Sequence, residues 1–191
     1  LSTIMGIEGK FLVRLGDDYL SWNQIQVVWD SGSYDYYGRP VEGKLSNINM
    51  TVNANEWSHI AVTFGEKTIK VYVNGVEKGS STTNVPSSVN FGIAHNDEQG
   101  TRITRCFWVG YSYEHARYFP GMMSELRIWN RVLTADELAN ATRRYGVDPK
   151  SEGLVTYWKC DEGQGDVIKD HTSYRNDLAS DGLKWEPVSL P

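Results

Sequence analysis

Alternating runs of apolar residues, separated by short turn-forming segments, constrain the fold of this chain most strongly. Between residues 58 and 64, apolar residues alternate with polar or small ones, a period-two pattern that is typical of a half-buried strand. A second alternating run covers 69–73 and is followed by Asn74 and Gly75. A type I′ turn needs positive φ at both central residues, which Asn and Gly tolerate. The pattern therefore predicts three antiparallel strands joined by two tight turns.

The rest of the sequence repeats this pattern and contains one helix signal. Alternation also predicts strands at 1–15, 24–29, 45–52, 89–93, 103–113 and 122–129. Seven Trp, eleven Tyr and eighteen Gly fit many short strands joined by turns. Thr134 and Glu137 have the spacing of a capping box, and Gly146 is placed to end a helix. We therefore expect an all-β protein with one short helix near 134–145.

Length and charge narrow the classes of protein to which the chain can belong. A chain of 191 residues fits one all-β sandwich, so 1–191 is predicted to be a single domain. The net charge of −5 is spread along the sequence without a basic face, which argues against nucleic acid as a partner. No apolar stretch reaches the roughly 20 residues that a membrane span requires. Cys106 and Cys160 could form one disulfide or stay two buried thiols, and both alternatives are open.

Four segments carry a family resemblance, and their order and spacing make it specific. They read WSHIAVTF from Trp57, IKVYVNG from Ile69, FWVGYS from Phe107 and FPGMMSELRIWNRVLT from Phe119. The chain resembles the laminin G-like branch of the concanavalin A-like lectin/glucanase superfamily, of the kind found in multidomain bacterial surface proteins. The resemblance implies a two-sheet antiparallel jelly-roll sandwich and an extracellular or cell-surface location. Since relatives usually carry a further strand upstream of Thr3, we expect the chain to be the C-terminal part of a longer protein with other domains.

Two aromatic clusters contain the residues that we expect to bind a ligand. One lies in the polar loop 30–40 and the other in 111–119. An exposed aromatic ring offers a flat face to the C–H side of a sugar ring or to a protein partner. The expected ligand-binding residues, on loops at one end of the sandwich, are Tyr34, Tyr36, Tyr37, Tyr113, His115 and Tyr118. The alternative is that some of these rings fold back over the edge of the sandwich.

The tail, residues 153–185, is expected to supply the closing strands of the same sandwich, in an order that resembles a circular permutation. Its Asp170 and Asn176, with Ser173 and Asp177, offer oxygen atoms to a calcium ion. The alternative is an Asx-type turn in which these side chains satisfy local N–H groups. No other metal site is predicted, and no cofactor is expected to be required.

The sequence predicts binding rather than catalysis. A glycosidase needs two carboxylates about 5–10 Å apart across a cleft, but the sequence lacks an E-x-D-x-x-E strand and Glu125 is an isolated acid. We therefore expect no catalytic residues. The expected function is that of a non-catalytic carbohydrate-binding module of a secreted or cell-surface protein, with a glycan as its partner. The alternative is a protein-interaction or spacer domain that meets an extracellular protein and binds no glycan.

Overall fold

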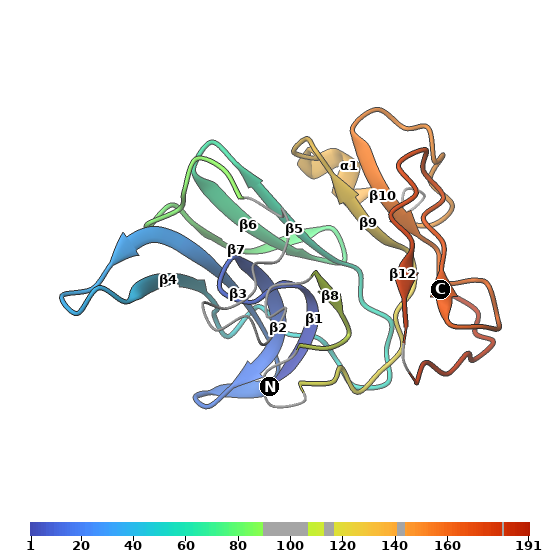
Figure 1. Ribbon diagram of the computed structural model, residues 1–191, viewed down its shortest axis with the longest axis horizontal. Coiled ribbons are helices and arrows are strands. Elements are labelled where there is room, and N and C mark those ends of the chain that lie inside the picture. The colour runs from blue at the N-terminus through green and yellow to red at the C-terminus, as the bar shows by residue number, and fades with distance from the viewer. Residues whose placement is uncertain (90–106, 113–116, 141–143, 181) are drawn as a thin grey trace, which may run out of the picture. The chain divides into compact units, whose positions relative to one another are not determined.

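A computed structural model of the protein describes residues 1–89, 107–112, 117–140, 144–180 and 182–191 (Figure 1). The chain divides into two compact units. The first consists of Leu1–Val73 and Glu77–Pro120, and the second of Asn74–Val76 and Gly121–Pro191. The predicted ligand-binding residues Tyr113 and His115 lie outside the described residues, as does Cys106. The expectation that 1–191 forms one sandwich domain stays a prediction.

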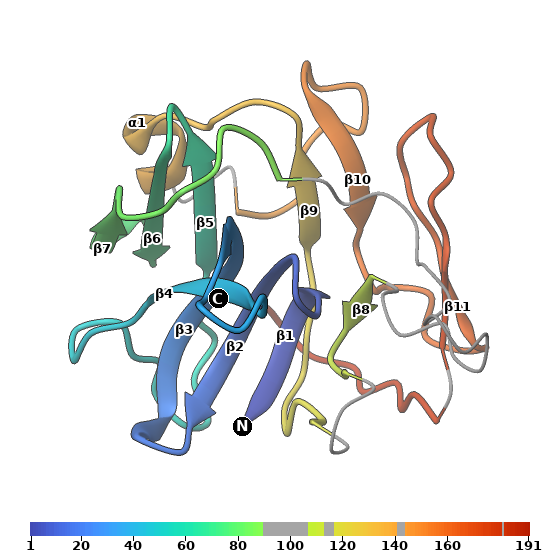
Figure 2. The same cartoon turned by 60° about the vertical axis from the view of Figure 1, so that its left-hand side comes forward.

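A five-stranded antiparallel sheet in the first unit has the strand order β4-β3-β2-β1-β8. Its members are β1 (Ser2–Ile7), β2 (Phe11–Asp17), β3 (Leu20–Tyr34), β4 (Pro40–Leu45) and β8 (Trp108–Val109). Figure 2 shows β3, β2 and β1 side by side. Since Tyr34 pairs with Pro40, β3 and β4 form a long hairpin whose connecting tip is only 35–39. The loop predicted at 30–40 is therefore largely strand.

A three-stranded sheet confirms the most strongly patterned part of the sequence. It consists of β5 (Ile60–Gly65), β6 (Thr68–Val73) and β7 (Val76–Ser81) in that order. Asn74 and Gly75 have φ values of 52° and 80°, as a type I′ turn requires. Glu66 and Lys67 connect β5 to β6 and also have positive φ, 49° and 57°. The first turn thus places two ordinary residues in a conformation that favours glycine.

Replacing Lys67 by Gly is expected to stabilise the protein by about 1 kcal/mol, because the left-handed conformation costs an L-residue about that much. The free energy of urea unfolding measures the effect. The matched control is Lys70→Gly in the interior of β6, where φ is not positive and glycine is expected to destabilise the strand. Stabilisation by both substitutions, or by neither, would contradict this account of the turn.

Apolar side chains from both sheets form one core in the first unit. The five-stranded sheet contributes residues of β2 and β3, and the three-stranded sheet contributes Ile69, Val71 and Val73. Trp29 is 1% exposed, and its indole nitrogen donates to the carbonyl of Asn84 at 2.8 Å. Two sheets that enclose a shared apolar layer are the defining feature of a β-sandwich. The predicted all-β, two-sheet antiparallel fold is confirmed.

One predicted strand, 45–52, is wrong. β4 ends at Leu45, and Asn47 then makes a turn: its carbonyl accepts from the backbone N–H of Met50, and its side-chain oxygen accepts from that of Asn49. Ile48 is exposed, whereas Met50 is buried in the core. An Asn side chain that satisfies local N–H groups competes with strand pairing, and alternation alone does not reveal this.

The regular elements in the described part of the second unit are short strands and one helix. They are β9 (Leu126–Trp129), α1 (Ala135–Ala139), β10 (Leu154–Trp158), β11 (Val167–Ile168) and β12 (Leu178–Ala179). The capping box is confirmed, since the Thr134 hydroxyl accepts from the N–H of Glu137 while the Glu137 carboxylate accepts from that of Thr134. The helix ends earlier than predicted, at Ala139, where Asn140 is already extended.

Candidate ligand-binding surfaces

Tyr34, Tyr36 and Tyr37, here called the tyrosine tip, lie at the turn between β3 and β4 and are 71%, 95% and 78% exposed. Asp35 fixes the backbone of this turn. One of its carboxylate oxygens accepts from the N–H groups of Tyr37 and Arg39 at 2.9 and 2.8 Å, and its own N–H donates to the carbonyl of Arg39. A side chain that accepts from the backbone two residues on is an Asx turn. The tyrosines therefore project from a hydrogen-bonded support.

Two rings of the tyrosine tip, those of Tyr36 and Tyr37, are nearly perpendicular to each other. The centroids of Tyr36 and Tyr37 are 5.3 Å apart and their planes meet at 86°, which is the edge-to-face geometry that aromatic pairs prefer. The Arg39 guanidinium lies 5.7 Å from the centroid of the Tyr37 ring, within cation–π range. The tip thus combines aromatic faces with a cationic donor.

A second aromatic surface, the aromatic ladder, consists of Trp108, Tyr111 and Tyr118. Successive ring centroids are 5.0 and 4.9 Å apart, and Tyr118 at the end of the series is 65% exposed. The backbone around it is anchored, since Phe119 donates to the carbonyl of Gly110 and Gly110 donates to that of Ile4. Of the residues predicted in 111–119, Tyr118 is therefore the one for which the structure gives a position.

A buried ionic cluster lies beside the aromatic ladder. One carboxylate oxygen of Glu8 accepts from the Ser112 hydroxyl at 2.6 Å and from the Arg117 guanidinium at 2.9 Å. Both Glu8 and Ser112 are buried. Removing one partner of a buried ion pair is strongly destabilising, so this cluster holds Ser112 and Arg117 beside the end of β1.

The structure does not bring the tyrosine tip and the aromatic ladder together. The tip extends from β4 and the ladder begins on β8, which are the two edges of the five-stranded sheet. Four strand spacings separate these edges, about 19 Å. Tyr118 also lies beside the start of β1, since the N–H of Thr3 donates to the carbonyl of Arg117. The tip instead extends past Trp29, which pairs with Phe11 at the other end of the sheet. Tyr118 and the tip therefore form two separate surfaces and do not share one end of the sheet.

Sequence reasoning missed Tyr19 and Trp22, which are 97% and 66% exposed. Tyr19 lies in the two-residue turn between β2 and β3, where Asp17 pairs with Leu20, and Trp22 lies near the start of β3. The signal that marks them is their position at the turn formed by Asp18 and Tyr19, because a ring in or beside a two-residue turn has little sheet to cover it.

Asp170 and Asn176, the expected calcium residues, form a hydrogen-bonded turn. Asp170 is 1% exposed, and its carboxylate accepts from the N–H groups of Tyr157, Thr172 and Asn176 and from the Thr172 hydroxyl, at 2.9–3.0 Å. The geometry matches the Asx-type alternative. Calcium near Asp170 and Asn176 stays a prediction, and the ion would have to compete with these donors.

Two further side chains, Glu125 and Cys160, interact with neighbouring residues of the second unit. Glu125 accepts from the Tyr157 hydroxyl at 2.6 Å and from the N–H of Gly146 at 3.2 Å. Burial, and then the Glu125 carboxylate, raise the pKa of Tyr157. Cys160 is a free thiol, and burial followed by the nearby acidic groups raises its pKa to about 12. The thiol alternative therefore holds for Cys160, which stays protonated at neutral pH.

The chain has a known family and a similar solved structure. Residues 3–139 match the family described as the concanavalin A-like lectin/glucanases superfamily. A crystal structure of a protein from Bacteroides ovatus ATCC 8483 that is proposed to bind carbohydrate has 27% identity and a TM-score of 0.73; the match covers 100% of this chain and 50% of that one. The chain thus spans about half the length of that protein.

A second solved structure has only low similarity to this chain. An S-layer domain-containing protein from Clostridium thermocellum ATCC 27405, residues 221–444, has 21% identity and a TM-score of 0.31, over 71% of this chain and 62% of that one. A search among curated proteins gives no significant match. Among the described residues, no helix is long and apolar enough to cross a membrane.

From the match over 3–139, the chain is a member of the concanavalin A-like lectin/glucanases superfamily, as the four sequence segments predicted.

Proposed function

We propose that this chain is a non-catalytic carbohydrate-binding module of an extracellular or cell-surface protein, and that the tyrosine tip is its principal glycan-binding surface. The observation that carries the proposal is the cluster of three tyrosines, each more than 70% exposed, at one hydrogen-bonded turn. Single exposed apolar side chains are common on protein surfaces, whereas an exposed cluster marks an interaction site.

The chemistry of the tip suits a sugar. A pyranose has an apolar C–H face and a rim of hydroxyl groups, so it needs an aromatic face together with polar partners. Tyr36 and Tyr37 provide two perpendicular faces, and Asp35 and Arg39 place a carboxylate and a guanidinium beside them. Because the turn is already hydrogen-bonded, little conformational entropy is lost when the ligand binds.

The comparisons support this assignment at the level of the class. The superfamily name includes lectins, and the Bacteroides ovatus protein is proposed to bind carbohydrate. The name also includes glucanases, so the absence of catalysis needs its own test. Hydrolysis of a glucan that is abolished by Glu125→Gln would contradict the non-catalytic part of the proposal.

A protein-binding module is the second candidate. The exposed rings of the tip and of the ladder, at opposite edges of one sheet, would also fit a protein partner at each edge. Aromatic residues are enriched in protein interfaces for the same reason that they are used in sugar sites. Glycan binding therefore has to be measured directly.

Substituting Tyr36 by Ala is expected to weaken glycan binding about tenfold, since an aromatic contact of this kind contributes about 1.5 kcal/mol beyond area burial. A glycan array identifies the ligand, and calorimetric titration of that ligand measures the loss. Tyr36→Phe, which keeps the ring, is expected to bind nearly as well as the parent protein. Tyr19→Ala is the matched control, because Tyr19 is equally exposed but lies in the turn before β3, at the end of that strand opposite to the tip.

Two outcomes would contradict the proposal that the tyrosine tip is the glycan-binding surface. Binding that Tyr36→Ala leaves unchanged, but Tyr118→Ala reduces, would move the site to the aromatic ladder. Absence of binding to every glycan at millimolar concentration would favour the protein-interaction module instead.

A further inference from the structure

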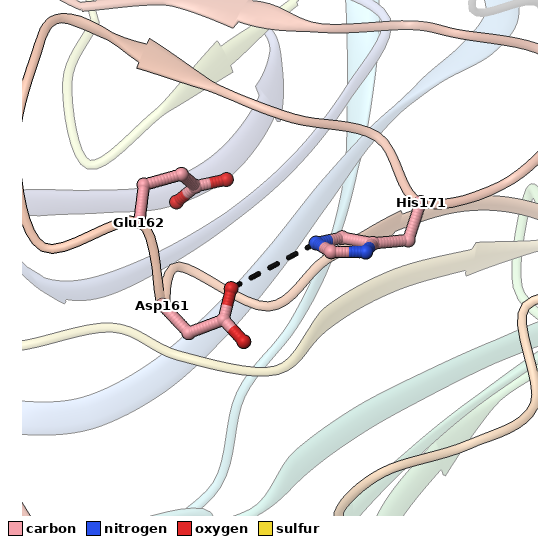
Figure 3. A group of neighbouring side chains, drawn as sticks. All are labelled: Asp161, Glu162 and His171. Atoms are coloured by element: carbon pink, nitrogen blue, oxygen red, sulfur yellow. Dashed lines mark ion pairs between the residues drawn. The ribbon is translucent and has the colours of Figure 1, made fainter.

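Three side chains in the second unit converge around a common point, namely Asp161, Glu162 and His171 (Figure 3). Each offers one ligand atom, and these atoms all lie within 4.8 Å of one another. Asp161 and Glu162 follow β10, whereas His171 follows β11. The N–H of His171 donates to the carbonyl of Tyr157, and Trp158 forms a bridge with Asp170. Antiparallel pairing of the two segments therefore brings the three side chains together.

Two of these ligand atoms are buried without a hydrogen-bond partner among the described residues. They are the His171 Nε2 and the Glu162 Oε2. The nearest charged neighbour of the imidazole is an Asp161 oxygen at 3.8 Å, which is too far for a hydrogen bond. Buried polar atoms are nearly always satisfied in native proteins, and an unpaired one calls for an explanation such as an ion or a water. Both atoms belong to side chains of the group formed by Asp161, Glu162 and His171.

The surroundings hold the ligand atoms in place. The other carboxylate oxygen of Glu162 accepts from the N–H of Lys169 at 2.8 Å, which leaves Oε2 available. The ring of His171 packs against that of Tyr157, with centroids 6.0 Å apart. Partners that orient the ligating side chains are a usual property of metal sites.

We propose that Asp161, Glu162 and His171 bind a divalent transition-metal ion of the zinc class. One imidazole nitrogen and two carboxylate oxygens suit such an ion, whereas calcium and magnesium prefer oxygen ligands alone. Two carboxylates also balance the charge of a divalent ion. Zinc bonds of about 2.0–2.2 Å place tetrahedral ligands about 3.4 Å apart, so the exposed Asp161 moves slightly inward on binding. At least one coordination position is left for water or for an oxygen of a ligand.

This inference is independent of the proposed glycan site, which lies in the first unit. It also concerns residues that sequence reasoning passed over. Asp161 and Glu162 are separated from His171 by a stretch with no recognisable ligand spacing, so only the strand pairing reveals the group.

Calorimetric titration with ZnCl₂ tests the proposal on the full chain, freed of any affinity tag. Because thiols bind zinc, the parent for this experiment carries Cys106→Ser and Cys160→Ser. We expect one zinc ion per chain, and we expect His171→Ala and Glu162→Gln each to weaken binding at least tenfold. Asp166→Asn is the matched control, since Asp166 is an exposed carboxylate of the same unit outside the group. It is expected to bind zinc like the parent.

The same titration with CaCl₂ is expected to give no comparable binding. The proposal is overturned if the parent takes up no stoichiometric zinc, or if folded His171→Ala and Glu162→Gln both bind zinc as the parent does. Thermal unfolding without metal establishes that the variants are folded. If His171→Ala is unfolded, Glu162→Gln decides, because its remaining oxygen can still accept from Lys169.

Discussion

Replacement of Asp170 by Ala is expected to destabilise the second unit by about 4 kcal/mol. The buried carboxylate accepts from three backbone N–H groups and one hydroxyl, and each buried donor left unpaired costs about 1–3 kcal/mol. Urea unfolding monitored by tryptophan fluorescence measures the loss. Asp166→Ala, which removes an exposed carboxylate from the same unit, is expected to change the free energy of unfolding by less than about 0.5 kcal/mol.

The charge of Asp170 also predicts a pH dependence. Burial raises the pKa of this carboxyl, but the hydrogen bonds from Tyr157, Thr172 and Asn176 outweigh burial and bring the pKa below its usual value of 3.8. The folded pKa is thus below the unfolded one. The stabilisation is present above about pH 4 and is lost as the pH falls through the folded pKa. Asp170→Asn should remove this acid-dependent loss, and an unchanged pH profile in that variant would refute the assignment.

Gly43→Ala is expected to destabilise the first unit by about 3 kcal/mol, the upper part of the range for overpacking a core. Gly43 pairs with Trp29 across β3 and β4, and a Cβ at this position would overlap the indole ring. Its φ is not positive, so the cost is steric rather than conformational. In a strand without such a neighbour, alanine would instead stabilise relative to glycine.

A double-mutant cycle tests whether the cost of Gly43→Ala arises from a steric clash with the indole ring of Trp29. Trp29→Phe shrinks the ring and removes its hydrogen bond to Asn84, so it destabilises by itself. If Gly43→Ala clashes with the indole, its cost falls when Trp29 is already Phe, and the two effects are less than additive. Strict additivity in urea unfolding would show that the glycine is needed for another reason.

Sequence patterns predicted the parts of the fold that are specified by contacts between residues close together in the sequence. The hairpins of 60–81 were predictable because alternation and the Asn74-Gly75 turn specify the same register. The capping box of Thr134 and Glu137 was predictable because both hydrogen bonds lie within one helical turn. The strand predicted at 45–52 is absent because the side chain of Asn47 accepts from the N–H of Asn49 and its carbonyl accepts from that of Met50.

The candidate sites were harder to predict because they depend on pairing between distant segments. The tyrosines of 34–37 were visible as a cluster, but their separation from Tyr118 follows from the order of five strands. The group of Asp161, Glu162 and His171 requires β10 and the segment after β11 to be neighbours. No spacing rule carries that information.

The position of β4 at a sheet border has a consequence for solubility. A border strand exposes unpaired peptide groups to which a second molecule can add a strand, and proline and charged residues discourage such addition. β4 begins with Pro40 and places Glu42 and Lys44 in solvent. We therefore expect these three residues to discourage a second molecule from adding a strand at this border, beside the tyrosine tip.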